Sequence, residues 1–196
     1  MVSGMQDRHV VIAGMDTALG REMARHYRGI GARVTELAVG TGEDPDAAAG
    51  AVSGDIDLLV VADDTHPPDR SAGTVTRDEL SASLLRLTFA PMRIAALLKP
   101  QLAGAEGTLV LLSRLSATMP QAGGARRYLE RPFRAATHAL WRCMSVEWRE
   151  AGIACRIVVL ADGEDAAGRI ADAIALPLDR AALVEPIDIS GAVRSW

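Results

Sequence analysis

Short apolar segments alternate with longer amphipathic segments along the chain. Most of the short segments are continuous runs of Val, Ile, Leu and Ala, which is typical of strands buried on both faces of a parallel sheet. These segments span residues 9–14, 32–39, 56–62, 107–113, 153–160 and 184–189. The pattern therefore predicts a mostly parallel sheet with both faces covered.

The longer segments carry apolar residues at helical spacing and lie between the predicted strands. Proline bends the second of these helices at Pro91 and ends it at Pro100, and Gly152 ends the third. The predicted helices span residues 19–28, 78–99, 132–151 and 164–175. Between residues 40 and 55 the chain has few large apolar residues, which predicts a loop with at most a short helix and no strand.

This order of elements defines the expected fold class. Strands that alternate with helices along the chain predict an α/β fold, a doubly wound and mostly parallel sheet of the Rossmann type. No internal repeat or linker interrupts the order, so we expect residues 1–196 to form one domain.

Composition narrows the class of protein further. With 196 residues and 49% hydrophobic content, the chain is long and apolar enough for one core, which excludes a disulfide scaffold and a disordered tail. The sequence has no run of about 18 apolar residues and no secretory signal, so we expect a cytoplasmic protein without a membrane span. The net charge of −4, with both signs interspersed, argues against a nucleic-acid surface. Cys143 and Cys155 are predicted to be buried thiols, and no metal site is predicted.

Three residue counts constrain the chemistry. The 21 basic residues are 20 arginines and one lysine, the chain has two tyrosines, and it has no asparagine. Such a preference for arginine suggests a GC-rich bacterial source. The missing asparagine excludes catalytic mechanisms that need an asparagine. A mechanism that needs a lysine has only Lys99 to use.

The first strand ends in a turn that contains two glycines. Residues 13–20 read AGMDTALG, and such a turn brings backbone N–H groups close to a pyrophosphate at the start of a helix. The turn resembles the Thr-Gly-x-x-x-Gly-x-Gly motif of the short-chain dehydrogenase/reductase family, with Ala13 for the threonine and Ala18 for the middle glycine. Gly14 and Gly20 remain as the cofactor contacts that the resemblance implies.

The resemblance extends over nearly the whole chain in the family's order. IDLLVVADD at residues 56–64 resembles the family's fourth strand, and GTLVLLS at 107–113 resembles its fifth. VEWREAGIACRIVVL at 146–160 resembles the end of its long sixth helix and the following strand. The family's third strand and the segment that covers its substrate are not visible, so the resemblance implies reduced cofactor and substrate regions.

The family's catalytic Tyr-x-x-x-Lys pair is missing. Neither Tyr27 nor Tyr128 has a lysine four residues further on, and the single lysine, Lys99, belongs to another predicted helix. A count without gaps places the positions of the pair at Glu130 and Arg134. An arginine is permanently charged and can hold a ribose, but a carboxylate is no simple substitute for a phenol.

The remaining family positions are also altered. Ser113 matches the catalytic serine, but Arg114 stands at the motif's second serine, and Ser116 offers a displaced hydroxyl. The position of the family's asparagine falls near Arg86. After the second strand, Ala38 and Val39 stand where the family binds the cofactor's ribose, and neither has a polar side chain.

These losses favour a catalytically degenerate subunit that assembles with an active homologue, or with itself, as a structural or regulatory partner. Such a subunit would need no cofactor. The long helices are then interface elements. Their candidate interface residues are Leu84, Leu87, Ile94, Leu98, Phe133, Leu140, Trp141, Met144 and Trp148.

Two other functions stay open. One is an atypical NAD(P)-dependent oxidoreductase for a carbonyl or hydroxyl substrate. The other is a non-redox isomerase or dehydratase that uses Glu130 or His66, or a ligand sensor. His66 is a candidate general base with Asp63 or Asp64 as its orienting group, or else an exposed loop histidine. The arginines near the start of the third long helix form either an anion site or a solvated face; they are Arg126, Arg127, Arg131 and Arg134.

Overall fold

The computed structural model describes residues 5–14, 16–38, 44–62, 64–118, 126–161, 163 and 166–194. Its strands are β1 (His9–Ala13), β2 (Arg33–Leu37), β3 (Leu58–Ala62), β4 (Thr108–Arg114), β5 (Ala154–Leu160) and β6 (Pro186–Ile187). Its α-helices are α1 (Ala18–Gly29), α2 (Pro45–Gly50), α3 (Arg77–Leu84), α4 (Ala90–Leu97), α5 (Lys99–Gly104), α6 (Arg131–Glu147) and α7 (Ala167–Ile174).

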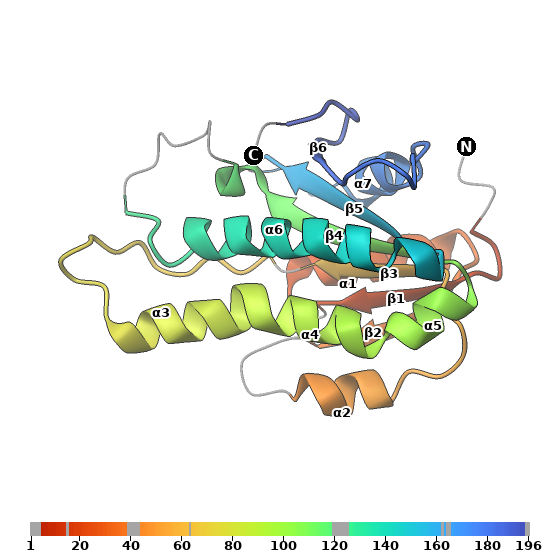
Figure 1. Ribbon diagram of the computed structural model, residues 1–196, viewed down its shortest axis with the longest axis horizontal. Helices are drawn as coiled ribbons and strands as arrows, with labels where there is room; N and C mark the ends of the chain where they lie inside the picture. The colour runs from red at the N-terminus through yellow and green to blue at the C-terminus, as the bar shows by residue number, and fades with distance from the viewer. Residues whose placement is uncertain are drawn as a thin grey trace.

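The six strands form one sheet in the order β2-β1-β3-β4-β5-β6, and every pairing in it is parallel. The predicted doubly wound Rossmann-type fold is therefore confirmed. Alternate strand residues point to opposite faces: Val11 packs with α2, α4, α5 and α6, whereas Val10 packs with α1 and α7. Figure 1 shows these two helical layers and places the carboxyl ends of the strands on the side where α3 and α6 begin.

The predicted second long helix is a succession of helical segments. After α3 comes a π-helical turn, η1 (Leu85–Phe89), and then α4. The predicted end of this helix near Lys99 is confirmed, because α4 ends at Leu97. A short helix that was not predicted, α5, then begins at Lys99, and Pro100 lies in its first turn, where a backbone N–H is not needed. The short helix α2 lies in the segment where at most one was expected.

Most of the candidate interface residues lie inside the chain's own core. Leu87, Ile94, Leu98, Trp141, Met144 and Trp148 are buried. They pack between the helices and the sheet, so they present no surface to a partner. Phe133 and Leu140 are partly buried, and the Leu84 side chain is exposed (46%). Leu84 is exposed while its neighbour Ser83 is buried, so Leu84 lies on the side of α3 that faces away from the core. Figure 1 shows α3 extending beyond the carboxyl ends of the strands.

The structure also tests the predictions about the cysteines and about a membrane span. Cys155 is buried as predicted, but Cys143 is exposed, since its position on α6 faces away from the core. The continuous helical stretch Arg77–Leu97 is long and apolar enough to span a membrane by length and composition. Its second half supplies core residues such as Ile94 and Ala95, which also accounts for its apolar character.

Candidate functional site at the carboxyl edge of the sheet

The turn between β1 and α1 requires glycine at its first position. Gly14 has a φ of +127°, and a Cβ atom there would lie 2.1 Å from the carbonyl oxygen of Ala62 at the end of β3. The Thr17 hydroxyl donates to the carbonyl oxygens of Gly14 (2.7 Å) and Ala62 (3.1 Å) and accepts from the Gly20 N–H at 3.0 Å. The turn is thereby held against the neighbouring strand.

An ion pair joins this turn to the helix above it. The Nη2 atom of Arg86, in η1, donates to Oδ2 of Asp16 at 2.7 Å. Arg86 is the residue that the sequence placed near the family's asparagine. Here it links the glycine turn to the long helical segment.

Arg114 connects the ends of three strands. It is buried at the end of β4, and its Nε atom donates to Oδ1 of Asp64 at 3.0 Å. Its Nη1 atom donates to the carbonyl oxygen of Ala161, just after β5, at 3.3 Å. Ser113, the neighbouring candidate, is also buried.

Glu130 lies at the centre of a polar cluster. The residue is 4% exposed, and its Oε1 atom accepts hydrogen bonds from Ser116 Oγ and Arg134 Nε, each at 3.2 Å. Its Oε2 atom lies 3.6 Å from Nη1 of Arg127. Arg134 also donates through Nη2 to the carbonyl oxygen of Thr65 at 2.6 Å. The two positions that the sequence assigned to the missing Tyr-Lys pair are therefore in direct contact.

His66 lies between two carboxylates. Its Nε2 atom is 3.6 Å from Oδ1 of Asp64, and its Nδ1 atom is 3.7 Å from Oε1 of Glu130. The side chain is 51% exposed, so the ring reaches both the buried cluster and solvent. Sequence reasoning paired His66 with Asp64 but missed its contact with Glu130. Asp63, the other candidate partner, is outside the described residues.

His138, one turn beyond Arg134 on α6, is a functional-site neighbour that sequence reasoning missed. Burial, and then the positive charge of Arg134, lower the pKa of His138 to about 4. The imidazole is therefore neutral at physiological pH. A histidine four residues after an arginine on an otherwise apolar face was the signal available in the sequence.

The remaining predicted positions, after β2, add no polar side chain to the site. Ala38 follows β2 and carries no polar group for a ribose, and Val39 is outside the described residues. Within the described part of the chain, no three His, Cys, Asp or Glu side chains are grouped to hold a metal ion. The residues that gather at the carboxyl edge are thus the glycine turn, the Arg114–Asp64 pair and the cluster around Glu130.

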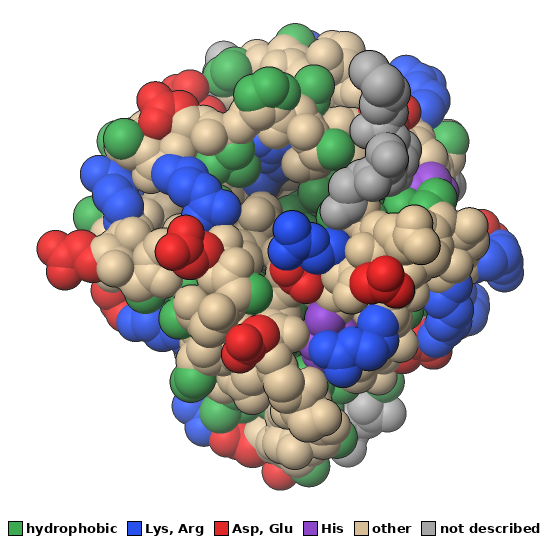
Figure 2. Space-filling view, turned by 90° about the vertical axis from the view of Figure 1, so that its right-hand side faces the viewer, with side chains coloured by type: hydrophobic (Ala, Val, Ile, Leu, Met, Phe, Trp, Pro, Cys, Tyr) green, Lys and Arg blue, Asp and Glu red, His purple; other side chains and the backbone are tan. Residues whose placement is uncertain are grey.

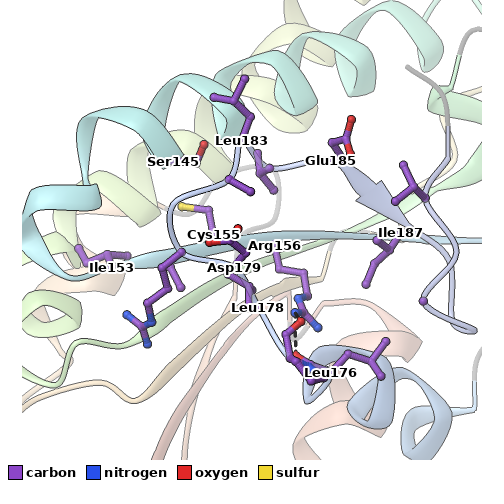
Figure 3. Close-up of a pocket in the computed structure, with 17 residues that line it drawn as sticks. Ser145, Ile153, Cys155, Arg156, Leu176, Leu178, Asp179, Leu183, Glu185 and Ile187 are labelled. Carbon is purple, nitrogen blue, oxygen red and sulfur yellow. Dashed lines mark hydrogen bonds between the residues drawn. The ribbon is translucent and has the colours of Figure 1, made fainter.

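The opposite, amino edge of the sheet has a hollow of about 260 Å³ between α6, β5 and the segment after α7 (Figure 3). One of its lining residues, Arg156, is buried, and its guanidinium donates to the carbonyl oxygens of Ala173 (2.5 Å), Ile174 (3.0 Å), Leu176 (2.8 Å) and Pro177 (3.2 Å). Burial lowers the pKa of Arg156 and raises that of the Cys155 thiol to about 12. Figure 2 shows the molecule from this side, with Lys and Arg interspersed with Asp and Glu.

Several solved structures are similar to this chain over nearly its whole length. A carbonyl reductase from chicken fatty liver with NADPH bound is 15% identical, with a TM-score of 0.85, and the match covers 100% of this chain and 96% of that one. A protein described as a short-chain dehydrogenase/reductase from Burkholderia multivorans, with bound NADP, is 19% identical (TM-score 0.78; 97% and 100% covered). The carbonyl reductase Sniffer of D. melanogaster is 13% identical (TM-score 0.80; 97% and 100% covered).

These likenesses define the fold, which is that of the short-chain dehydrogenase/reductases. No protein-family model matches the sequence. No curated protein matches it significantly.

Proposed function

We propose that the chain is an atypical NAD(P)-dependent oxidoreductase that interconverts a carbonyl and a hydroxyl group at the carboxyl edge of the sheet. The observation that carries this proposal is the buried Glu130 carboxylate. It contacts the Ser116 hydroxyl, the Arg134 guanidinium and the His66 ring. Glu130 and Arg134 are the positions to which the family resemblance assigns the missing Tyr-Lys pair. A cluster of this kind can position a substrate oxygen and exchange protons with it.

The glycine turn fits the diphosphate of a nicotinamide nucleotide. Gly14 has no room for a side chain, and α1 directs the positive end of its dipole at the turn. Gly14 would let the diphosphate approach the backbone of the turn, whereas the N–H groups of Gly14 and Gly20 already donate to the Leu37 carbonyl oxygen and the Thr17 hydroxyl. Ala38 offers no side-chain contact for the ribose, so we expect weaker binding than in reductases that have one. Two of the proteins with the same fold, the chicken carbonyl reductase and the Burkholderia multivorans protein, have NADPH or NADP bound, which supports this assignment.

When bound, nicotinamide nucleotide supplies the hydride that reduces a carbonyl carbon, or accepts it in the reverse reaction. The chain's own residues then handle the oxygen and its proton. We assign the proton to His66, because histidine is the side chain that most often serves as a general acid or base and this ring is open to solvent. Glu130 and Asp64 orient the ring, and the Ser116 hydroxyl, which donates to Glu130 in this structure, would turn to donate to the substrate oxygen.

The first experiment measures cofactor binding and turnover in the same preparation. Nicotinamide fluorescence and thermal unfolding are followed as NADPH or NADH is added, and a ligand at a hundredfold its Kd should stabilise the fold by roughly 2.7 kcal/mol. A panel of aldehydes and ketones then tests reduction. Absence of binding at millimolar cofactor would overturn the proposal.

Two histidine variants test the assigned roles. We expect His66→Asn to lower kcat by about tenfold or more without changing cofactor affinity, since general acid catalysis contributes about a hundredfold or more. His26→Asn, which removes an imidazole from α1 away from this edge, should leave kcat unchanged. Equal activity of wild type and His66→Asn would contradict the role of His66 in proton transfer.

A second candidate is the non-catalytic subunit. It is favoured by the apolar side chains that α3 and η1 expose: Leu80, Leu84, Leu85 and Phe89. Such a patch suits a second copy of the chain or an active homologue. Native mass spectrometry would show an oligomer that Leu85→Glu dissociates, together with no cofactor binding. A monomer that binds cofactor would contradict this candidate.

A further inference from the structure

Three arginines lie at the start of α6 and in the turn before it. Arg131 and Arg134, three residues apart, share one side of α6. Arg127 precedes the helix and is tied to its first turn, because the Arg131 N–H donates to the carbonyl oxygen of Arg127 at 3.1 Å. Sequence analysis left open whether these residues bind an anion or form a solvated surface.

The three side chains run from solvent to the buried cluster. The side chain of Arg127 is 33% exposed, whereas that of Arg134 is 5% exposed. Arg127 and Arg134 approach the two oxygens of Glu130 from opposite ends, at 3.6 and 3.2 Å. Arg131 lies between them in the sequence, and its Nη2 atom donates to the carbonyl oxygen of Thr118 at 3.2 Å. Thr118 directly follows the 3-10 turn that contains Ser116.

Among the described residues of this face, three guanidinium groups outnumber one carboxylate. The carboxylate that the described residues place against the three guanidinium groups is Glu130, and Arg131 pairs there with an uncharged carbonyl oxygen. The other described carboxylate beside His66 belongs to Asp64, which pairs with Arg114. The chain as a whole carries a net charge of −4, so the local excess does not follow from composition. Partial burial weakens screening by salt and strengthens attraction for an anion.

We propose that this face, formed by Arg127, Arg131 and Arg134, binds the carboxylate of an acidic substrate, so that the oxidoreductase acts on oxo acids or hydroxy acids. The inference rests on the function proposed above. A guanidinium holds a carboxylate with two parallel hydrogen bonds, which suits Arg131 as the principal contact and Arg127 as the second. The carbonyl of such a substrate is bonded to its carboxylate, so it would lie toward Ser116 and His66. Both of these residues contact Glu130, as Arg127 does.

A matched pair of substrates tests the charge requirement. Phenylglyoxylate and its methyl ester present the same ketone with and without a negative charge. We expect Arg131→Gln to raise the KM for phenylglyoxylate by about tenfold and to leave the KM for the ester unchanged, because one charge-assisted contact is lost. Arg149→Gln, the same change at an exposed residue beyond the far end of α6, should alter neither. Equal KM values for acid and ester in the wild type would overturn the inference while leaving the oxidoreductase intact.

A binding measurement separates this inference from the function itself. Calorimetry compares benzoate with the neutral benzamide, with no cofactor or turnover needed. Tighter binding of benzoate, lost in Arg131→Gln and kept in Arg149→Gln, supports the anion site even if no reduction is observed. Equal binding of the two ligands overturns it. If Arg131→Gln instead weakens NADPH but not NADH, the anion is the phosphate of the cofactor, and the assignment to substrate is wrong.

Discussion

The Nδ1 atom of His66 lies 3.7 Å from Oε1 of Glu130, although one residue belongs to the loop after β3 and the other immediately precedes α6. The contact brings a solvent-exposed ring against a buried carboxylate. Together with the hydrogen bonds from Ser116 and Arg134, it makes Glu130 the residue on which the geometry of the cluster depends.

Removal of the Glu130 carboxylate should therefore lower the free energy of unfolding. In Glu130→Ala the buried guanidinium of Arg134 loses this partner, and breaking a buried ion pair costs about 3–5 kcal/mol of unfolding free energy. Urea denaturation measures the loss. The control is Glu147→Ala, which removes an exposed carboxylate from the other end of α6 and should cost about 1 kcal/mol or less. Similar losses in both variants would show that the Glu130 cluster does not stabilise the fold.

Gly14 should tolerate no side chain. Gly14→Ala combines a φ of +127° with a Cβ atom 2.1 Å from the Ala62 carbonyl oxygen, so the turn must distort. We expect a loss of more than about 2 kcal/mol, together with weaker nucleotide binding. The control is Gly29→Ala at the last residue of α1, where an added Cβ atom would have no heavy atom within 4 Å. This change should be neutral or stabilise the fold by up to about 1 kcal/mol. Thermal unfolding of the two variants side by side checks both expectations.

Arg156 should contribute to stability at the amino edge. Its guanidinium donates to four carbonyl oxygens at and beyond the end of α7, and Arg156→Met removes all of these donors. Each buried acceptor left without a partner costs about 1–3 kcal/mol before relaxation, so we expect a total loss of at least about 2 kcal/mol. Arg149→Met, at an exposed site, should change the denaturation midpoint little. Hydrogen exchange would locate the loss in α7.

The buried imidazole of His138 should make stability fall on the acid side of neutrality. Its pKa is lowered to about 4 in the folded chain, while an unfolded histidine has a pKa of about 6.5. Below pH 6.5 the unfolded chain binds a proton that the folded chain does not, so unfolding becomes easier as the pH falls to about 4. The total effect is about 3 kcal/mol. We expect His138→Gln, which cannot take up this proton, to show a shallower decline in urea denaturation between pH 7 and 4. Parallel declines would contradict the buried, neutral state of His138.

The strands were predictable because strands buried on both faces need continuous apolar residues, a requirement that β1, β3, β4 and β5 meet. The exposure of Leu84 was not predictable from periodicity. It depends on which side of α3 packs against the rest of the chain, and the π-helical turn after α3 shifts the helical register.

The members of the site were predictable, but their contacts were not. Counting along the sequence located Glu130 and Arg134, and the loop composition drew attention to His66. The distance between His66 and Glu130 depends on how the loop after β3 packs against the start of α6. No spacing within either segment specifies that distance.

β2 is the outermost described strand on one side of the sheet, and its free edge has consequences for aggregation. Unpaired backbone groups of an edge strand can recruit the edge of another molecule. β2 carries exposed charges at Arg33 and Glu36, and Glu36 forms an ion pair with Arg28 of α1. A molecule docking strand to strand would have to desolvate these charges. The charged side chains of β2 therefore disfavour strand-to-strand association at this edge.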